Sequence, residues 1–372
     1  MSETTSAAPS SASLPRHGRA LVRVFAVVAM YYAILGYPPL RLADLLVPEW
    51  RPQGPVLAAV FVLPAAGWLL YQRWRNPLTR LALRVTYAWL GVCWMALFVV
   101  AAGEVLGLAL GLDPLVQGAG SLAATLALAG IGFTNALRLP VRRIAVAAPG
   151  LERPLRLVQL SDVHVGSRGG GFLARIVART NALAPDCVLI TGDLVDLARL
   201  PPSALAPLAR LAGPSYFAIG NHERYIDADR ICREIAGHGV RVLRNEARVE
   251  GPLQIIGIDD AERRDQVARE LARIPIDRSR FPVLLYHRPD GLEAAARAGV
   301  GLMLSGHTHN GQIVPFNLLV RRVFARICGR YESGRTVLYV SPGTGTWGPP
   351  LRLGSCNELT EITLCPREPP AP

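Results

Sequence analysis

The sequence predicts a layered α/β domain that follows a helical membrane segment of about four spans. Hydrophobic residues make up 51% of the 372 residues, and most of the excess lies before about residue 138 in long uncharged runs. From Pro154 onward, short apolar runs alternate with amphipathic stretches, which is the pattern of β-α-β units. Polar clusters follow several of these short runs, where the carboxyl ends of parallel strands place functional loops.

The membrane segment is predicted from four apolar runs, at residues 20–40, 55–71, 84–110 and 115–137. A helix needs about 20 residues to cross the hydrocarbon core. The last two runs meet this length, whereas the first two are shorter or contain proline, so three spans is the alternative. The first run could instead be a signal peptide. No small-x-small cleavage site follows it and further spans come at once, which favours a signal-anchor helix.

The orientation of the spans is predicted from arginine, which accounts for all 40 basic residues. Arginines gather before the first run, between the second and third, and after the fourth, which places both termini in the cytoplasm. The formal charge is +12, and residues 1–150 hold 12 arginines against five acidic residues. This surplus flanks apolar segments and indicates contact with anionic lipid. The six cysteines show no C-x-x-C spacing and are predicted to be reduced.

Residues 1–19 and 367–372 are predicted to be disordered tails, residues 20–140 the membrane helices and residues 150–366 the catalytic domain. Glu104 and Gln117 lie within the apolar runs. An acidic residue within a membrane span is a functional candidate. Glu104, however, lies near the end of a long apolar run, and the favoured interpretation is that it reaches the interface. Strands are predicted at 155–160, 187–191, 216–219, 241–243, 253–258, 282–286, 301–304, 337–340 and 359–364. Helices are predicted at 172–183, 204–211, 228–237, 263–274 and 292–298.

Five of the seven histidines follow predicted strands in clusters rich in Gly, Asp and Asn. The clusters are Ser161-Asp162-Val163-His164, Gly192-Asp193, Gly220-Asn221-His222-Glu223, Tyr286-His287 and Gly306-His307-Thr308-His309. A lone His-x-His is more often a pair of surface or core residues, but here the other clusters favour a shared site. His307 and His309 can serve one site only if the backbone turns, and Gly306 is where a turn costs least.

This donor set contains more nitrogen and oxygen groups than one tetrahedral zinc can use, and it lacks a thiolate. It suits two divalent ions that share a carboxylate and clamp the attacking and leaving oxygens of a phosphoryl ester. The clusters resemble, in order and spacing over about residues 154–365, the motifs of the calcineurin-like metallophosphoesterases. The segment from Tyr339 to Gly354 is similar to the C-terminal signature of a bacterial membrane-anchored branch. The chain departs from that branch at Asn310 and Pro342.

The resemblance implies a four-layer αββα sandwich of two sheets flanked by helices. It implies that one metal ion is held by Asp162, His164 and His309, that a second is held by Asn221, His287 and His307, and that Asp193 bridges them. Manganese is the expected metal, with iron, zinc or cobalt as alternatives. His222 would protonate the leaving alkoxide or steady the phosphoryl oxygens while metal-activated water attacks.

Other polar residues have two interpretations each. Glu223 could orient His222 or be a helix-start acid, and Asp196 could support a ligand or cap a helix. Four arginines are candidates for binding the substrate phosphate, because guanidinium groups match phosphate oxygens, although most arginines here are expected on solvated faces. The four are Arg224, Arg288, Arg263 and Arg264.

These observations predict a multi-pass protein of the bacterial inner membrane, with a cytosolic phosphoesterase domain acting on a lipid-linked or amphipathic phosphoester or pyrophosphate. Relatives in the resembled branch are implicated in hydrolysis of UDP-2,3-diacylglucosamine, although His222 suggests a more general phosphodiesterase. The alternative is a transport or sensor protein with a regulatory phosphoesterase domain. Nucleic acid is not an expected substrate, since residues 151–372 hold 28 arginines against 23 acidic residues and show no arginine-aromatic stripe.

Overall fold

The computed structural model describes residues 25–366 except 50, 167, 169, 199 and 202. Both predicted tails, 1–19 and 367–372, lie outside the described residues. The chain divides into two compact units. One holds the chain up to Ala66 together with Val92–Thr125, and the other holds Gly67–Gly91 and everything from Leu126 onward. The second unit therefore contains both the sheets and the adjoining ends of three long helices.

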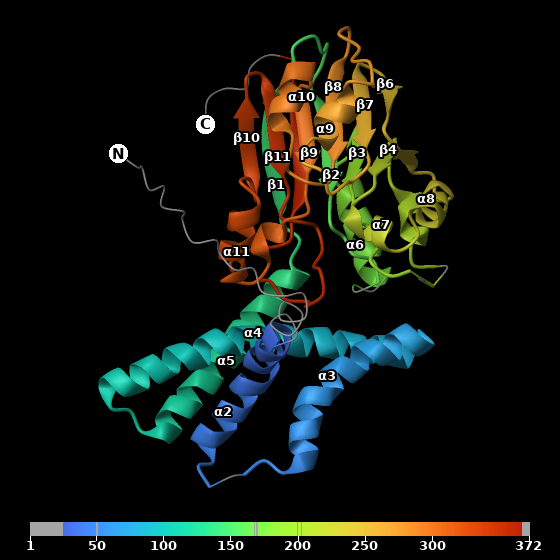
Figure 1. Ribbon diagram of the computed structural model, residues 1–372. Helices are drawn as coiled ribbons and strands as arrows, with labels where there is room; N and C mark the ends of the chain where they lie inside the picture. The colour runs from blue at the N-terminus through green and yellow to red at the C-terminus, as the bar shows by residue number, and fades with distance from the viewer. Residues whose placement is uncertain are drawn as a thin grey trace, which may run out of the picture. The chain divides into compact units, whose positions relative to one another are not determined.

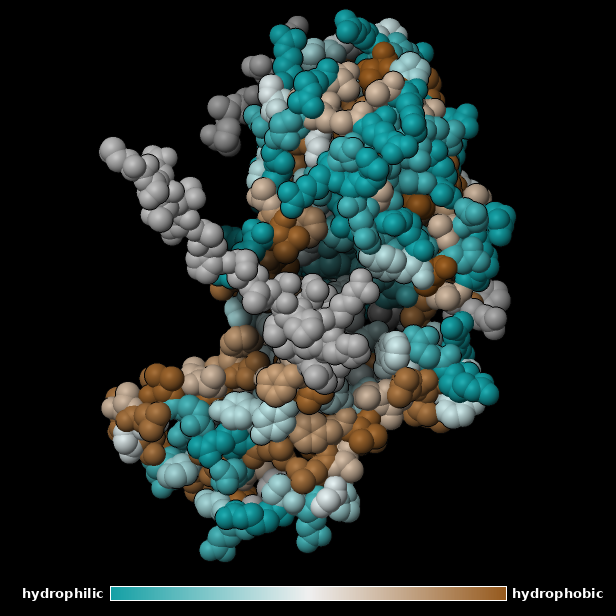
Figure 2. All heavy atoms as spheres, in the orientation of Figure 1, coloured by the Kyte–Doolittle hydropathy of each residue, from teal (hydrophilic) through white to brown (hydrophobic). Residues whose placement is uncertain are grey.

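Four helices are long and apolar enough to cross a membrane, which confirms the prediction of about four spans. They are Phe25–Leu46, α3 (Gly54–Trp74), α4 (Pro77–Leu110) and α5 (Pro114–Leu137). Within the first, the π-helical turn η1 (Tyr32–Gly36) precedes α2 (Tyr37–Leu46). The surface of these helices is largely apolar, whereas the surface of the strand-containing part is mostly hydrophilic (Figure 2).

Glu104, the acidic residue within a predicted span, is ion-paired. Its Oε1 lies 2.5 Å from Nε of Arg41, and Arg41 also contacts Asp44. An acidic residue in an apolar span is a candidate for transport when it lines a pathway. Here its charge is neutralised within the helical unit, which weakens the case for transport.

The strand-containing part has two six-stranded sheets (Figure 1). The first has the order β1-β12-β2-β3-β4-β5 and the second β10-β11-β9-β8-β7-β6. Strands β2 to β5 are parallel, and so are β7, β8, β9 and β11. Their bounds are β1 (Val141–Ala147), β2 (Leu155–Leu160), β3 (Cys187–Thr191), β4 (Ser215–Ala218), β5 (Arg241–Leu243), β6 (Glu246–Glu250), β7 (Leu253–Ile258), β8 (Phe281–Tyr286), β9 (Leu302–Ser305), β10 (Gly329–Ser333), β11 (Thr336–Val340) and β12 (Leu359–Cys365).

The central strands are apolar on both faces because each sheet is covered on both sides. In β3, Cys187 and Leu189 enter the core between the sheets, while Val188 and Ile190 enter the core on the outer side of their sheet. This alternation follows from the two-residue period of a strand, and strands buried on both faces give continuous apolar sequences.

Helices complete the four layers that the resemblance implies. The outer core of the first sheet includes residues of α6 (Gly170–Asn181), the short 3-10 helix η2 (Ala206–Arg210) and α8 (Ala228–Ala236). On the other side, α9 (Gln266–Leu271) and α10 (Leu292–Ala298) lie over the sheet that contains β7, β8 and β9 (Figure 1). The fold is thus an αββα sandwich, in agreement with the prediction.

Three strands and two helices were not predicted. Edge strands β6 and β10 carry charged and half-exposed residues, so they lack an apolar run. Strand β1 is basic and half-exposed, and it pairs with β12. Helix α7 (Asn221–Tyr225) is a single short element, and α11 (Phe316–Val323) buries none of its residues. The predicted helix at 204–211 is only the 3-10 helix η2, with Pro207 as its second residue.

Candidate metal centre

The five polar clusters meet at the carboxyl ends of five strands. Asp162 and His164 follow β2, Asp193 follows β3, and Asn221 begins α7 directly after β4. His287 follows β8, and the two histidines of the His-x-His motif follow β9. Parallel strands end at a common edge, so residues far apart in sequence converge there. The two sheets contribute to one site because their carboxyl ends lie on the same side.

One group of donors consists of Asp162, His164 and His309. Nε2 of His164 lies 3.1 Å from Nε2 of His309, and the latter lies 3.4 Å from Oδ1 of Asp162. All three residues are buried. The amide of His307 donates to both carboxylate oxygens of Asp162, and the Ser161 hydroxyl donates to Oδ2. These bonds hold the carboxylate with its free lone pairs toward the imidazoles.

The second group consists of Asp193, His287 and His307, with Asn221 beside them. Nε2 of His287 lies 3.1 Å from Asp193 Oδ2, 3.1 Å from Asn221 Oδ1 and 3.2 Å from His307 Nδ1. A third group joins Asp193 to His164 and His222. Asp193 therefore lies within reach of donors from both sides of the site.

These donors fit a divalent cation on chemical grounds. His287 Nδ1 lies 2.8 Å from the carbonyl oxygen of Thr191, which can only accept, so the proton on this ring belongs on Nδ1. The lone pair on Nε2 then points at two oxygen acceptors, and a cation between them removes the repulsion. Without a metal a proton fills this role: burial lowers the pKa of His287, but the Asp193 carboxylate outweighs burial and raises the pKa to about 10.

The other three imidazoles are held in the neutral form that metal binding requires. Burial and neighbouring cationic groups lower the pKa of His164 and of His309 well below the usual value. Burial also lowers the pKa of His307 to about 3. The pKa of Asp162 is raised to about 6 by burial and by the charge of Asp193. A bound cation would reverse this last effect.

Backbone strain is concentrated in the same loops. Asp162, His164, Asp193, His307 and His309 all have φ between 49° and 71°. Non-glycine residues rarely adopt this left-handed conformation, and where they do the site is commonly functional. Asn310, which replaces the usual glycine of the resembled branch, is also left-handed at φ 50°. Asparagine tolerates this conformation better than most residues, so the departure preserves the loop.

Gly306 is required for space and not for a turn. A Cβ atom at this position would lie 2.0 Å from Ser161 Oγ and 2.1 Å from Asp162 Oδ2. The left-handed residues that turn the chain are His307 and His309 themselves. Thr308 also has a role that the sequence did not suggest, because its hydroxyl donates to the carbonyl of Ile327.

His222 lies at the edge of the site and is partly accessible, with 17% of its side chain exposed. Its amide donates to Asp193 Oδ1, and its Nε2 lies 3.9 Å from Asp193 Oδ2. Burial lowers its pKa, which the Asp193 charge partly offsets. The half-exposed ring of Trp347 lies 6.1 Å away, measured between centroids. This arrangement leaves His222 accessible to a substrate bound over the two groups.

Glu223 does not orient His222, which was one of its two predicted roles. Its carboxylate is fully buried and accepts from the amides of Asp193, Val195 and Gly220. The bonds join the loop after β3 to the loop after β4. Burial and the Asp193 charge raise its pKa to about 7. Glu223 thus supports the backbone that presents Asp193.

Arg352, which the sequence analysis did not single out, is fully buried beside His309. Its guanidinium donates to the carbonyls of His309, Pro342 and Gly345, and one nitrogen lies 3.3 Å from His309 Nδ1. Burial lowers its pKa to about 10. The sequence contained one indication of this role. Arg352 lies between two leucines in an apolar stretch of the C-terminal signature, and a buried arginine needs hydrogen-bond partners.

The four arginines predicted to bind phosphate fall into two pairs. Arg224 and Arg288 both pair with the buried carboxylate of Asp260, at 2.7 Å and 2.6 Å. Arg263 and Arg264 are exposed, and the former pairs with Asp265. Asp196, in contrast, is close to the site, with Oδ2 at 3.9 Å from His164 Nδ1.

Two sheets between helices, with carboxylate, imidazole and amide donors at the strand ends, define an α/β domain with a candidate metal centre. Residues 155–311 match the family model for calcineurin-like phosphoesterases. An uncharacterised metallophosphoesterase of Campylobacter jejuni is 34% identical over 245 residues, covering 62% of this chain and 65% of the relative. A zebrafish transmembrane protein with a metallophosphoesterase domain is 36% identical over 271 residues, covering 66% and 62%. An uncharacterised metallophosphoesterase of Aquifex aeolicus is 31% identical, covering 56% of this chain and 85% of its own length.

The chain belongs to the calcineurin-like metallophosphoesterase family. It spans less than two thirds of the length of the first two of these relatives. The grouped Asp and His residues are able to hold metal ions, as membership of this family implies.

Proposed function

We propose that this protein is a membrane-anchored phosphoesterase with two divalent metal ions, acting at the cytosolic face on an amphipathic phosphoester or pyrophosphate. The position of Asp193 carries the proposal, because it belongs to donor groups on both sides of the site. Asp162, His164 and His309 would hold one ion, Asn221, His287 and His307 the other, and Asp193 would bridge them. Manganese suits this set of nitrogen and oxygen donors, with iron, zinc or cobalt as alternatives.

Bound metals would supply an activated water and neutralise charge on the phosphoryl oxygens. The chain's own residues then have separate tasks. His222, accessible and held by its amide to Asp193, would donate a proton to the leaving oxygen. Glu223 and Arg352 would position Asp193 and His309 through the hydrogen bonds described above. The half-exposed Trp347 would pack against the part of the substrate next to the scissile bond.

The membrane segment supports an amphipathic substrate. Four helices are long and apolar enough to cross a membrane and would tether the site near a bilayer. Such tethering raises the effective concentration of any lipid-linked substrate. A relative named as a transmembrane protein with a metallophosphoesterase domain shows that this combination recurs. UDP-2,3-diacylglucosamine is one substrate of the proposed kind.

The test is hydrolysis of bis-p-nitrophenyl phosphate by the purified full-length protein with Mn²⁺. The wild type should be active, and Asp193→Ala and His222→Ala should each lose at least about a hundredfold in kcat, the usual contribution of such groups. Asp193→Ala should also lose metal, whereas His222→Ala should keep it. The control is Glu152→Ala, which changes an exposed acidic residue. Activity that survives in the Asp193→Ala, His222→Ala double variant would refute the proposal.

A further inference from the structure

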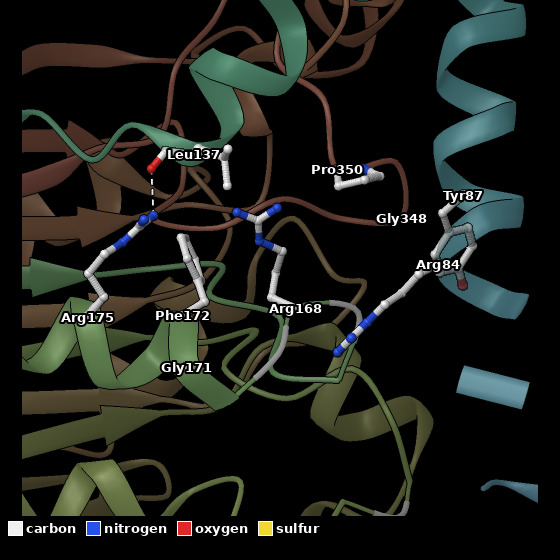
Figure 3. A pocket seen from close by; sticks show the side chains of 9 residues that line it. All are labelled: Arg84, Tyr87, Leu137, Arg168, Gly171, Phe172, Arg175, Gly348 and Pro350. Carbon is white, nitrogen blue, oxygen red and sulfur yellow. Dashed lines mark hydrogen bonds between the residues drawn. The ribbon is translucent and has the colours of Figure 1, made fainter. Parts of the chain in front are cut away.

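A cavity of about 390 Å³ lies next to the loop after β2 and is lined by three arginines. Arg84 extends from α4, while Arg168 and Arg175 come from the loop after β2 and from α6 (Figure 3). The rest of the lining includes apolar groups of Leu137, Phe172 and Pro350. The cavity lies entirely within the unit that contains both sheets.

The three arginines are not ion-paired with any acidic residue in the part of the chain that the structure describes. Arg168 is partly buried, and burial together with the charges of Arg175 and Arg84 lowers its pKa to about 10. Most arginines with comparable burial in this protein are paired, as Arg288 is with Asp260. Three mutually repelling cations around a cavity favour the binding of an anion.

Capping of α5 accounts for only part of this cluster. One nitrogen of Arg168 donates to the carbonyl of Ala136, and one of Arg175 donates to that of Leu137. The last carbonyls of a helix commonly need such donors. A guanidinium has five N–H groups, however, so each arginine keeps donors for a ligand. Arg84 caps nothing among the described residues, and its presence is not explained by the helix end.

The cavity also has an apolar wall beside its charged one. The guanidinium groups of Arg168 and Arg175 lie over the ring of Phe172. Their Cζ atoms are 4.2 Å and 5.2 Å from the ring centroid. Tyr87 of α4 lines the cavity one turn after Arg84 (Figure 3). Helix α4 has 34 residues, about 51 Å of helix against a hydrocarbon core of about 30 Å. Its first turns, with Arg84, can therefore reach the level of lipid head groups.

Two segments connect this cavity to the metal centre. The amide of Arg168 donates to the carbonyl of His164, one of the proposed ligands. On the other wall, Gly348 follows Trp347, whose ring faces His222. A ligand in the cavity would thus lie against the reverse side of the loops that shape the site.

We propose that the cavity formed by Arg84, Arg168 and Arg175 binds the phosphate-containing head group of an anionic membrane lipid. The guanidinium groups would contact the phosphate, and Phe172, Leu137 and Tyr87 would contact the glycerol backbone and the start of the acyl chains. This lipid-binding site rests on the proposed function, because it requires that the protein lies in a bilayer. It adds to that function a bound lipid next to the loop after β2. Basic cavities beside membrane helices bind such head groups.

The test measures lipid binding and not hydrolysis. Delipidated full-length protein in neutral detergent is titrated with phosphatidylglycerol or phosphatidylcholine, and bound lipid is counted by native mass spectrometry. The wild type should prefer phosphatidylglycerol. The double variant Arg84→Gln, Arg168→Gln should bind it roughly thirtyfold more weakly, as expected for the loss of two charges. Arg84→Gln alone, which leaves the cap of α5 intact, should show part of this loss.

Arg179→Gln is the matched control, because Arg179 is exposed on the same helix α6 and does not line the cavity. An equal loss in this control would show a general charge effect and overturn the proposal. Inorganic phosphate that competes as strongly as the lipid would show a free-phosphate site and overturn the lipid assignment. If the wild type hydrolyses the soluble diester but does not prefer phosphatidylglycerol, only the proposal of a lipid-binding cavity is refuted. If the wild type prefers phosphatidylglycerol but binds no metal, only the proposed phosphoesterase function is refuted.

Discussion

At the scale of single residues, Arg352 explains how one side of the metal centre is held in place. It is the largest fully buried side chain, and its guanidinium joins the carbonyl of His309 to the loop at 342–345. A planar fork with five donors can satisfy several carbonyls at once, which lysine cannot do. The C-terminal segment that contains Arg352 thus supports His309 through buried hydrogen bonds.

Arg352→Met should therefore reduce both stability and metal content. Several carbonyls would be left buried without donors, at a cost of at least about 3 kcal/mol of unfolding free energy. His309 would lose its support, so bound metal should fall below that of the wild type. Denaturant unfolding and elemental analysis measure the two effects, with Arg321→Met on the exposed α11 as control. Unchanged metal content in a folded Arg352→Met protein would remove this role.

Metal affinity should depend on pH in a predictable direction. The pKa of Asp162 is raised to about 6, so protons compete with metal for this carboxylate increasingly as the pH falls below that value. For each unit by which the pH falls, the dissociation constant for Mn²⁺ should rise by a certain factor. That factor should be about ten times larger below pH 6 than above it. Isothermal titration calorimetry between about pH 5 and pH 8 measures this. An equal slope on both sides of pH 6 would contradict it.

At the scale of elements, the close approach of the loops after β2 and β9 depends on Gly306. Gly306→Ala would place Cβ about 2 Å from the Ser161 hydroxyl and the Asp162 carboxylate, so one loop must move. We expect loss of metal and a lower melting temperature. Gly237→Ala is the control, because its Cβ would lie at 3.4 Å from its nearest atoms in a helical backbone. A Gly306→Ala protein with wild-type metal content would show that the loops are less tightly packed.

The central elements were predictable from the sequence and the peripheral ones were not. Strands such as β3 and β7 are buried on both faces, and their continuous apolar sequences gave the correct bounds. Edge strand β6 alternates charged residues, so its sequence resembles a loop. The candidate ligands follow these predictable strands, so their convergence at the strand ends could be predicted. Arg352 and Glu223 also bond backbone atoms of distant segments, and the identity of those partners could not be predicted from the local sequence around either residue.

At the scale of the whole molecule, the arginine distribution predicts that both termini face the cytoplasm. A C-terminal fluorescent protein should then be bright, and a C-terminal alkaline phosphatase should be inactive, because the phosphatase matures only outside the cytoplasm. Fusions after Gly111, in the predicted outer connection, should give the opposite pattern. An active phosphatase at the C-terminus would place the catalytic domain outside the cytoplasm and exclude a cytosolic substrate.

The proposed activity requires two metal ions that share Asp193, and anomalous diffraction can locate them. Crystals of the full-length protein grown with Mn²⁺ should give two anomalous peaks at the manganese edge. One peak should lie among Asp162, His164 and His309, the other among Asn221, His287 and His307, with Asp193 between them. A single peak, or none within reach of Asp193, would contradict the dinuclear centre.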